Sequence, residues 1–175
     1  MTAPTWSVRR LLEVVDAQIE ALAAVLIDCV EGGASVSFMH PLKHDRAVAF
    51  WRRVAQGVAA GERALLIAED AQGVCGTVQL VLDQPENQPH RAELSKMLVH
   101  RRARRRGLGA ALMRAAEATA RECGKTLLVL DTASAEAERL YERQGWVRVG
   151  VIPDYALLPH GGLCGTTVYY RDLGG

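Results

Sequence analysis

The residues best suited to chemistry lie in one stretch, from Glu93 to Leu112, where a strand runs into a basic turn, two glycines and an alanine-rich helix. The first turn of a helix has N–H groups without intrahelical partners, and the positive end of the helix macrodipole lies there too. Gly107 and Gly109 let a ligand approach the backbone, and residues 104–106, all arginines, add positive charge. The stretch predicts an anion site for a phosphorylated cofactor. The open alternative is a surface turn that only caps a helix.

Two common phosphate-binding patterns do not match this stretch. A dinucleotide-binding fold requires Gly-x-Gly-x-x-Gly, and Leu112 stands at the position of the third glycine. A P-loop requires Gly-Lys-Ser/Thr after the loop, which the stretch lacks. What remains is Arg104-x-x-Gly107-x-Gly109 after an apolar strand, which indicates another kind of phosphorylated cofactor.

Three further polar side chains stand where catalysis could occur. Glu93 lies on the strand that leads to the basic turn, and Asp131 ends the next strand, at the sheet edge where α/β proteins bind ligands. Tyr141 shares a helix face with Ala137. Each also has an ordinary structural interpretation: a solvated strand residue, an N-cap for the following helix and a core tyrosine with a wet hydroxyl.

The apolar pattern of the strand before the basic turn slips in phase. Ala92 and Leu94 occupy even positions, whereas Met97 and Val99 occupy odd ones. A β-bulge between the two pairs would produce this slip, and bulges re-aim backbone groups beside functional sites. The pattern therefore predicts a bulge, with backbone N–H donors near its end.

Periodicity and turn residues predict one α/β domain over residues 1–175. Strands are expected over 6–12, 63–69, 74–83, 92–99, 126–131, 146–152 and 166–172, and helices over 16–31, 42–60, 108–123 and 135–144. The strand, helix and strand of 92–131 form a βαβ unit, whose two strands should be parallel. Residues 153–165 are expected to be a long loop. Phe38, in the loop 34–41, is expected either to wall a substrate site or to pack in the core.

Two motifs resemble the signatures of the GCN5-related N-acetyltransferases. One is the loop Arg104–Gly109, and the other is Ala137-Glu-Arg-Leu-Tyr141-Glu-Arg-Gln-Gly145-Trp146, with Ala, Tyr and Gly-aromatic at intervals of four. The order of predicted elements is that family's over nearly the whole chain. The resemblance implies a mixed central sheet of about six to seven strands, flanked by about four helices, around a βαβ cofactor-binding core. The tabtoxin-resistance type of acetyltransferase looks most similar, from the segments Gly33-Ala-Ser, Lys96-Met-Leu-Val99 and Pro153-Asp-Tyr-Ala.

The resemblance implies that an acetyl group passes directly from acetyl-coenzyme A (acetyl-CoA), the cosubstrate, to an amine. It assigns Glu93 as general base, Asp131 as a carboxylate that holds the substrate ammonium or shares the base role, and Tyr141 as general acid toward the coenzyme sulfur. Substrate contacts are expected from Phe38, Glu93 and Asp131, and no metal is implied. Cofactor contacts are expected from Met97, Leu98, Val99, Arg104, Arg105, Arg106, Gly107, Leu108, Gly109, Ala110, Ser134 and Tyr141.

The sequence departs from the family pattern at two positions. Arg105 stands where the family often has glycine, so this arginine must adopt a conformation that glycine accepts more easily. Ser134 stands where the family often has an asparagine that contacts the cofactor. The serine can cap the following helix instead.

Composition narrows the remaining classes. The 21 basic and 20 acidic side chains give a net charge of +1, which argues against a dedicated nucleic-acid binder. The 4 cysteines lie far apart, without the pairing typical of zinc sites or disulfide frameworks. We find no signal-peptide pattern and no apolar run of about 18 residues, so a cytoplasmic protein without a membrane partner is expected.

The expected partner is a small-molecule amine, and an amino-acid-like toxin or antimetabolite is the natural candidate, with resistance as the role. A homodimer is left open because dimers are common in the family. Two alternative functions also stay open at this point: an acyl-coenzyme A binder without catalysis, and a nucleic-acid-binding module that uses the arginines of residues 101–106.

Overall fold

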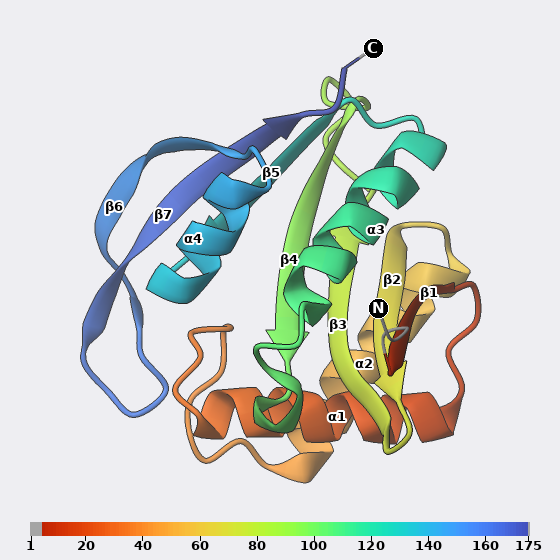
Figure 1. The fold of residues 1–175 in the computed structure, drawn as a ribbon, viewed down its shortest axis with the longest axis vertical. Helices are drawn as coiled ribbons and strands as arrows, with labels where there is room; N and C mark the ends of the chain where they lie inside the picture. Colours follow the sequence, from red (N-terminus) through yellow and green to blue (C-terminus); the bar gives the residue numbers. More distant parts are fainter. Residues whose placement is uncertain (1–4, 175) are drawn as a thin grey trace.

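The computed structural model describes residues 5–174 as an α/β structure with one seven-stranded mixed sheet and four α-helices (Figure 1). The elements are β1 (Trp6–Leu11), α1 (Asp16–Glu31), α2 (His44–Ala59), β2 (Arg63–Asp70), β3 (Gly73–Val81), β4 (Arg91–Val99), the 3₁₀ turn η1 (Arg101–Ala103), α3 (Leu108–Glu122), β5 (Leu127–Thr132), α4 (Ala135–Arg143), β6 (Val147–Leu157) and β7 (Leu163–Asp172). The sheet order is β1-β2-β3-β4-β5-β7-β6. The predicted fold class is confirmed.

The sheet divides at its centre. β4 and β5 are parallel, as the βαβ prediction requires, but they pair only from Arg91 opposite Leu127 to Glu93 opposite Val129. Beyond this point β5 continues its pairing with β7 while β4 stays with β3 (Figure 1). The carboxyl ends of the two parallel strands therefore separate, and this is the sheet position at which α/β folds bind ligands.

A bulge in β4 accompanies the separation. Ser95 lies opposite Gln79 and Leu98 lies opposite Thr77, so Lys96 and Met97 share one residue of β3 as their partner. Lys96 takes a positive φ of 51°. The bulge predicted from the phase slip is confirmed, and it turns backbone groups of β4 out of the regular ladder.

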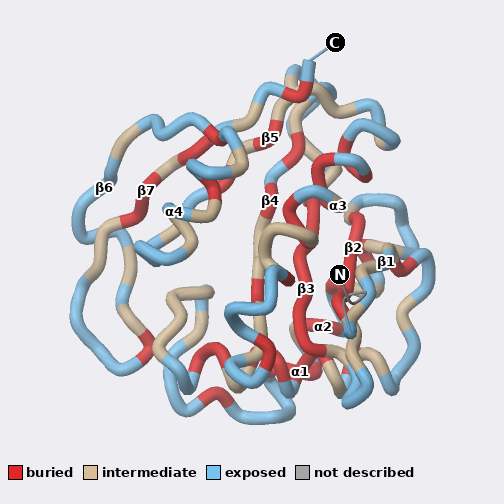
Figure 2. The backbone as a smooth tube through the Cα atoms, in the orientation of Figure 1, coloured by how far each residue is buried: buried red, intermediate tan, exposed pale blue. Residues whose placement is uncertain are grey.

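Two apolar layers hold the sheet between helices. On one face α3 packs through the buried side chains Leu108, Leu112, Met113, Ala116 and Ala120. On the other face α1 and α2 cover the sheet, and α1 buries the predicted stripe Ile19, Leu22, Ala23, Leu26 and Val30. Figure 2 shows buried backbone concentrated in β2, β3 and α3, whereas the β6 edge is exposed. Within residues 5–174, no helix is long and apolar enough to span a membrane.

The expected loop over 153–165 is wrong. β6 runs on to Leu157 and β7 begins at Leu163, so only a short turn with Gly161 and Gly162 at positive φ separates them. Proline and glycine normally indicate a loop, but β6 is an edge strand, where the missing N–H of Pro153 disrupts no ladder. The register also shifts between Ile152 and Ala156, so a bulge absorbs the irregular residues.

Candidate active site

The turn between η1 and α3 has the backbone conformation that an anion site at a helix N-terminus requires. Gly107, the N-cap of α3, has a left-handed φ of 80°, and the amides of the first helical turn follow it directly. Arg105 has a φ of 60°, the conformation expected of a residue that replaces glycine. A Cβ on Gly109 would lie 3.0 Å from Leu140 Cδ2, so this glycine lets α3 and α4 pack closely.

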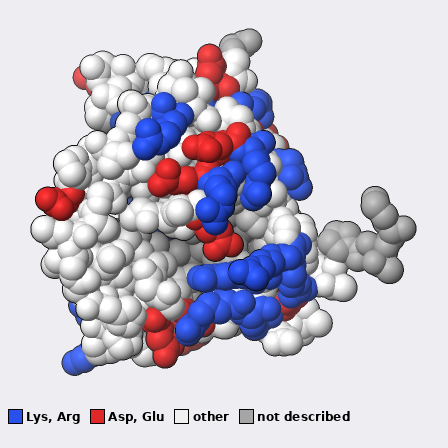
Figure 3. Space-filling model, turned by 60° about the vertical axis from the view of Figure 1, so that its left-hand side comes forward, with Lys and Arg blue, Asp and Glu red and all other residues white. Residues whose placement is uncertain are grey.

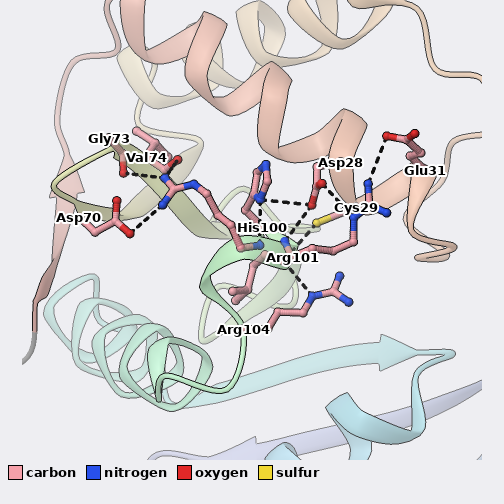
Figure 4. Close-up of polar contacts among 11 residues, drawn as sticks. Asp28, Cys29, Glu31, Asp70, Gly73, Val74, His100, Arg101 and Arg104 are labelled. Atoms are coloured by element: carbon pink, nitrogen blue, oxygen red, sulfur yellow. Dashed lines mark hydrogen bonds and ion pairs between the residues drawn. The ribbon is translucent and has the colours of Figure 1, made fainter.

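Three arginines of the basic run are neutralised within the protein. Arg101 pairs with Asp28 at 2.9 Å and with Glu31 at 3.2 Å, both on α1. Arg102 pairs with Asp70 at 2.7 Å (Figure 4). Arg106 pairs with the same carboxylate at 3.0 Å. Figure 3 shows one face of the molecule, on which Lys and Arg side chains lie next to Asp and Glu. The run is therefore not a uniform basic patch.

The predicted cofactor residue Arg106 is not on the wall of the cavity that the neighbouring arginines line. Its Nη1 lies 3.0 Å from an Asp70 carboxylate oxygen, and its Nη2 donates to Thr5 Oγ1 at 2.8 Å. Hydrogen bonds from Arg102 and Arg106 hold the pKa of Asp70 at about 2, with that from Arg102 the larger. The sequence could not reveal this pairing, because Asp70 lies 36 positions away on another strand.

Arg104 and Arg105 line the cavity and make no ion pair among the residues that the structure describes. Arg104 Nε donates to the carbonyl oxygen of Val99 at 3.2 Å, which ties the turn to the end of β4 (Figure 4). The guanidinium of Arg104 thus keeps donors for a ligand. Glycines at the turn, free amides and two unpaired arginines fit a phosphorylated cofactor.

One cavity of about 590 Å³ runs from this turn to the divide between β4 and β5. Its wall contains the predicted cofactor residues Met97, Leu98, Val99, Arg104, Arg105, Gly107, Leu108, Gly109, Ala110, Ser134 and Tyr141, together with Asp131. Segment 33–37 and Leu158 line it as well. The structure therefore gathers most predicted site residues around a single space.

Asp131 and Tyr141 stand on this wall with different surroundings. Asp131 accepts a hydrogen bond of 2.7 Å from Thr166 Oγ1, a buried hydroxyl on β7 that fixes the carboxylate. Tyr141 is 4% exposed, and its ring packs edge-on against Tyr169. Burial, with a smaller effect of the Asp131 charge, raises the pKa of the Tyr141 hydroxyl, so it stays protonated.

Ser134 uses its hydroxyl within the protein. The oxygen accepts from the backbone N–H of Ala137 at 3.2 Å, and Ser134 is the N-cap of α4. The side chain borders the cavity, yet its acceptor is committed to the helix. The structural alternative considered for this serine is thus present.

Besides Arg106, two further predicted residues are not on the cavity wall. Glu93 is exposed on β4 before the bulge, where the strand still pairs on both sides. Phe38 packs against Phe50 with ring centroids 5.3 Å apart, and contacts the α1–α2 core, as the second of its two predicted alternatives requires.

The sequence reasoning missed Lys96 as a site residue. Its side chain lines the cavity and donates from Nζ to Ser37 Oγ at 3.1 Å. Burial lowers the pKa of its ammonium, partly offset by the charges of Asp131 and Glu93. The available signal was its position inside the phase slip, since a bulge re-aims the residues that it contains.

Two connecting segments that border the cavity contact each other. His40, in the α1–α2 connection, donates its backbone N–H to the carbonyl of Pro159 at 2.9 Å. Its ring contacts the ring of His160 in the β6–β7 turn in a tilted arrangement, with the ring centroids 4.5 Å apart. Both connections contribute to the cavity wall, through Ser37 and Leu158 respectively.

A divided mixed sheet, with a turn of glycines and arginines before a helix N-terminus at the divide, suits a domain that binds a phosphorylated cofactor. The family model described as the acetyltransferase (GNAT) family matches residues 21–146, and the chain belongs to that family. It is an acetyl-CoA-dependent N-acetyltransferase, with acetyl-CoA as cosubstrate.

Three solved structures illustrate the similarity of fold. YncA of Salmonella typhimurium, solved with acetyl-CoA, has 20% identity and a TM-score of 0.79, with 97% of this chain and 95% of that chain covered. A phosphinothricin acetyltransferase of Sinorhizobium meliloti, in complex with acetyl-CoA, has 19% identity, a TM-score of 0.81 and coverage of 97% and 89%. A ribosomal-protein-alanine N-acetyltransferase of Brucella melitensis has 21% identity, a TM-score of 0.80 and coverage of 95% and 99%.

Proposed function

We propose that the acetyl acceptor is the amine of a small molecule, of the amino-acid-like toxin or antimetabolite kind, and that its acetylation confers resistance. The main support is the contact between His40 and the β6–β7 turn, through Pro159 and His160. The contact joins two segments whose residues Ser37 and Leu158 line the cavity, and a cavity bounded by both segments would suit a compact acceptor better than an extended peptide. Among the similar structures, the phosphinothricin acetyltransferase favours this class, and the ribosomal-protein enzyme represents the peptide class.

Binding of acetyl-CoA is assigned to the turn and the bulge. Gly107, Leu108, Gly109 and Ala110 would present the amides of the α3 N-terminus to the pyrophosphate, with Arg104 and Arg105 beside them. The backbone of Met97–Val99 lies beyond Glu93, the last residue of β4 that pairs with β5, and would orient the acyl group by donating N–H groups to its carbonyl oxygen.

Two carboxylates are candidates for the proton transfer from the acceptor. An alkylammonium has a pKa near ~10.4, so the amine must lose a proton before it attacks. Asp131 lies on the cavity wall and would hold the ammonium and receive its proton. Glu93 lies outside the wall, so a base role for Glu93 requires an intervening water.

Tyr141 would act at the other end of the reaction. Tyr141 lines the cavity, and its hydroxyl stays protonated because burial raises its pKa. It would donate a proton or a hydrogen bond to the coenzyme sulfur as the thiolate leaves, consistent with direct transfer and no acetyl-enzyme.

The test is a screen for release of free thiol from acetyl-CoA with three acceptor classes: small amines, amino acids including phosphinothricin, and peptides with a free N-terminal amine. We expect turnover with small acceptors, and an N-acetylated product by mass spectrometry. Turnover restricted to peptides would overturn the proposal.

The same assay distinguishes the roles of the carboxylates Asp131 and Glu93. Asp131→Asn should lower kcat/KM about 10²- to 10⁴-fold and shift activity to a pH at which the free amine is already deprotonated. Glu93→Gln is the matched variant on the neighbouring strand and should have a smaller effect. The reverse result would make Glu93 the base.

A further inference from the structure

Lys96 is an unusual cation for its position. It lies within the β4 bulge and lines the cavity that also contains Asp131. Its Nζ donates to Ser37 Oγ at 3.1 Å and lies 5.7 Å from the centroid of the Phe50 ring. Among the residues that the structure describes, no carboxylate forms an ion pair with it.

The arginines nearby behave differently. Arg101, Arg102 and Arg106 each contact a carboxylate at 3.0 Å or less, so the protein satisfies them internally. Lys96 has only a hydroxyl and an aromatic face. Lys96 is half-buried, and a partly desolvated ammonium without a contacting anion is unfavourable, so a ligand with an anionic group would offset that cost.

The electrostatic surroundings agree with an anionic ligand. Burial lowers the pKa of Lys96, Asp131 and Glu93 raise it, and Arg63 lowers it. These carboxylates act at a distance and leave the Nζ position open to a closer anion. Because Asp131 lies on the same wall, the cavity presents one anionic and one cationic side chain, Asp131 and Lys96, to a single acceptor.

We propose that Lys96 is a specificity-determining residue that binds the carboxylate of the acceptor, with Ser37 Oγ beside it, while Asp131 binds the acceptor's ammonium. The acceptor is then an amino acid rather than a simple amine. This inference rests on the proposed function and adds the carboxylate as a second group of the acceptor that the site recognises, besides the reacting nitrogen.

The main alternative for Lys96 is a base that removes the proton of the acceptor. A base acts on every acceptor amine, whether or not the acceptor has a carboxylate. An anion-binding lysine affects only acceptors with a carboxylate. An amino acid and its carboxamide share the amine and the side chain, so the pair distinguishes the two roles.

The experiment measures kcat and KM separately for L-methionine, L-glutamine and phosphinothricin, each beside its carboxamide. The variants are Lys96→Gln, Lys96→Arg and Lys43→Gln, an exposed lysine before α2 outside the cavity. The ratio of acid to amide is compared between wild type and variant, so the different pKa values of the two amines cancel.

We expect Lys96→Gln to raise KM for the amino acid about 10- to 100-fold, the size expected for a hydrogen bond to a charged group, and to change KM for the amide little. Lys96→Arg should restore part of the acid preference, and Lys43→Gln should have no effect. Ser37→Ala should raise KM for the acid by a smaller factor and serves if Lys96→Gln fails to fold.

Two results would overturn the inference with the enzyme still active. In the first, Lys96→Gln or Ser37→Ala raises KM by the same factor for the amino acid and for its carboxamide. In the second, simple amines are acetylated and no amino acid is. If no acceptor releases thiol although acetyl-CoA raises the melting temperature, the proposed function itself fails, and the inference with it. The thermal measurement thus distinguishes the two failures.

Discussion

Asp70 illustrates, at the scale of one residue, why the basic run is not free to bind anions throughout. Its carboxylate is held by Arg102 at 2.7 Å and by Arg106 at 3.0 Å. One acid therefore removes two arginines from the cofactor site and anchors the turn to the end of β2.

This anchor predicts a specific acid sensitivity. The folded pKa of Asp70 is about 2, below the ~3.9 of an unfolded chain, so the unfolded state binds a proton first as pH falls. The stabilisation is complete above the unfolded pKa and is lost as pH falls toward 2. Urea unfolding between pH 5 and 2.5 should therefore show a shallower loss of stability for Asp70→Asn than for wild type. Glu86→Gln, in an exposed loop, should behave as wild type; equal slopes for all three would contradict the anchor.

The Tyr141 hydroxyl is expected to act as a proton donor in the chemical step. Tyr141→Phe keeps the packed ring but removes the proton donor, so kcat should fall while acetyl-CoA affinity changes little. Activity should recover with an acyl donor whose leaving thiol has a lower pKa. Tyr155→Phe, at an exposed tyrosine on β6, is the control. Loss of acetyl-CoA affinity with unchanged kcat would assign Tyr141 to binding instead.

Among the elements, the turn before α3 depends most on backbone conformation. Gly107 and Gly124 lie at the two ends of α3 with φ of 80° and 74°. An L-residue at either position costs about 1–2 kcal/mol. Gly107→Ala should reduce acetyl-CoA affinity at least about tenfold by calorimetry, because the displaced turn misplaces the amides. Gly124→Ala should destabilise the fold by a similar amount, because its φ is also positive, and should bind acetyl-CoA with normal affinity. Similar affinities in both variants would mean that the turn is not the binding site.

The start of α4 gives a prediction about stability rather than binding. Ser134 caps this helix through its bond to Ala137. Ser134→Ala should cost about 1 kcal/mol of unfolding free energy, and Ser134→Thr should retain most of it. Acetyl-CoA affinity should be nearly unchanged in both. A large loss of affinity with unaltered stability would show that the hydroxyl serves the cofactor instead.

The elements also show what local sequence can and cannot predict. The phase slip between Leu94 and Met97 predicted the bulge because side-chain alternation records strand geometry directly. The 153–165 region was predicted as a loop because Pro153 is compatible with a strand only at a sheet edge, and edge position is a tertiary property. The partners of Phe38 and Arg106, which are Phe50 and Asp70, are likewise set by the fold and not by local sequence.

For the whole molecule, the order of elements was sufficient to predict the sheet and its βαβ centre. It did not predict that β4 and β5 pair over so few residues, since the divide depends on the bulge and on β7 packing beside β5. The cavity lies at this divide, and Asp131, Tyr141 and Lys96 all line it. Lys96 could be recognised only in three dimensions.

A crystal structure of the protein with acetyl-CoA bound would test the assigned site most directly. We expect the pyrophosphate to contact the amides from Gly107 to Ala110, with Arg104 beside it. We also expect the acetyl group to lie at the β4 bulge, with Tyr141 near the sulfur and with Asp131 and Lys96 facing the space left for the acceptor. A pyrophosphate bound away from the α3 N-terminus, or an acetyl group outside this cavity, would contradict the assigned site.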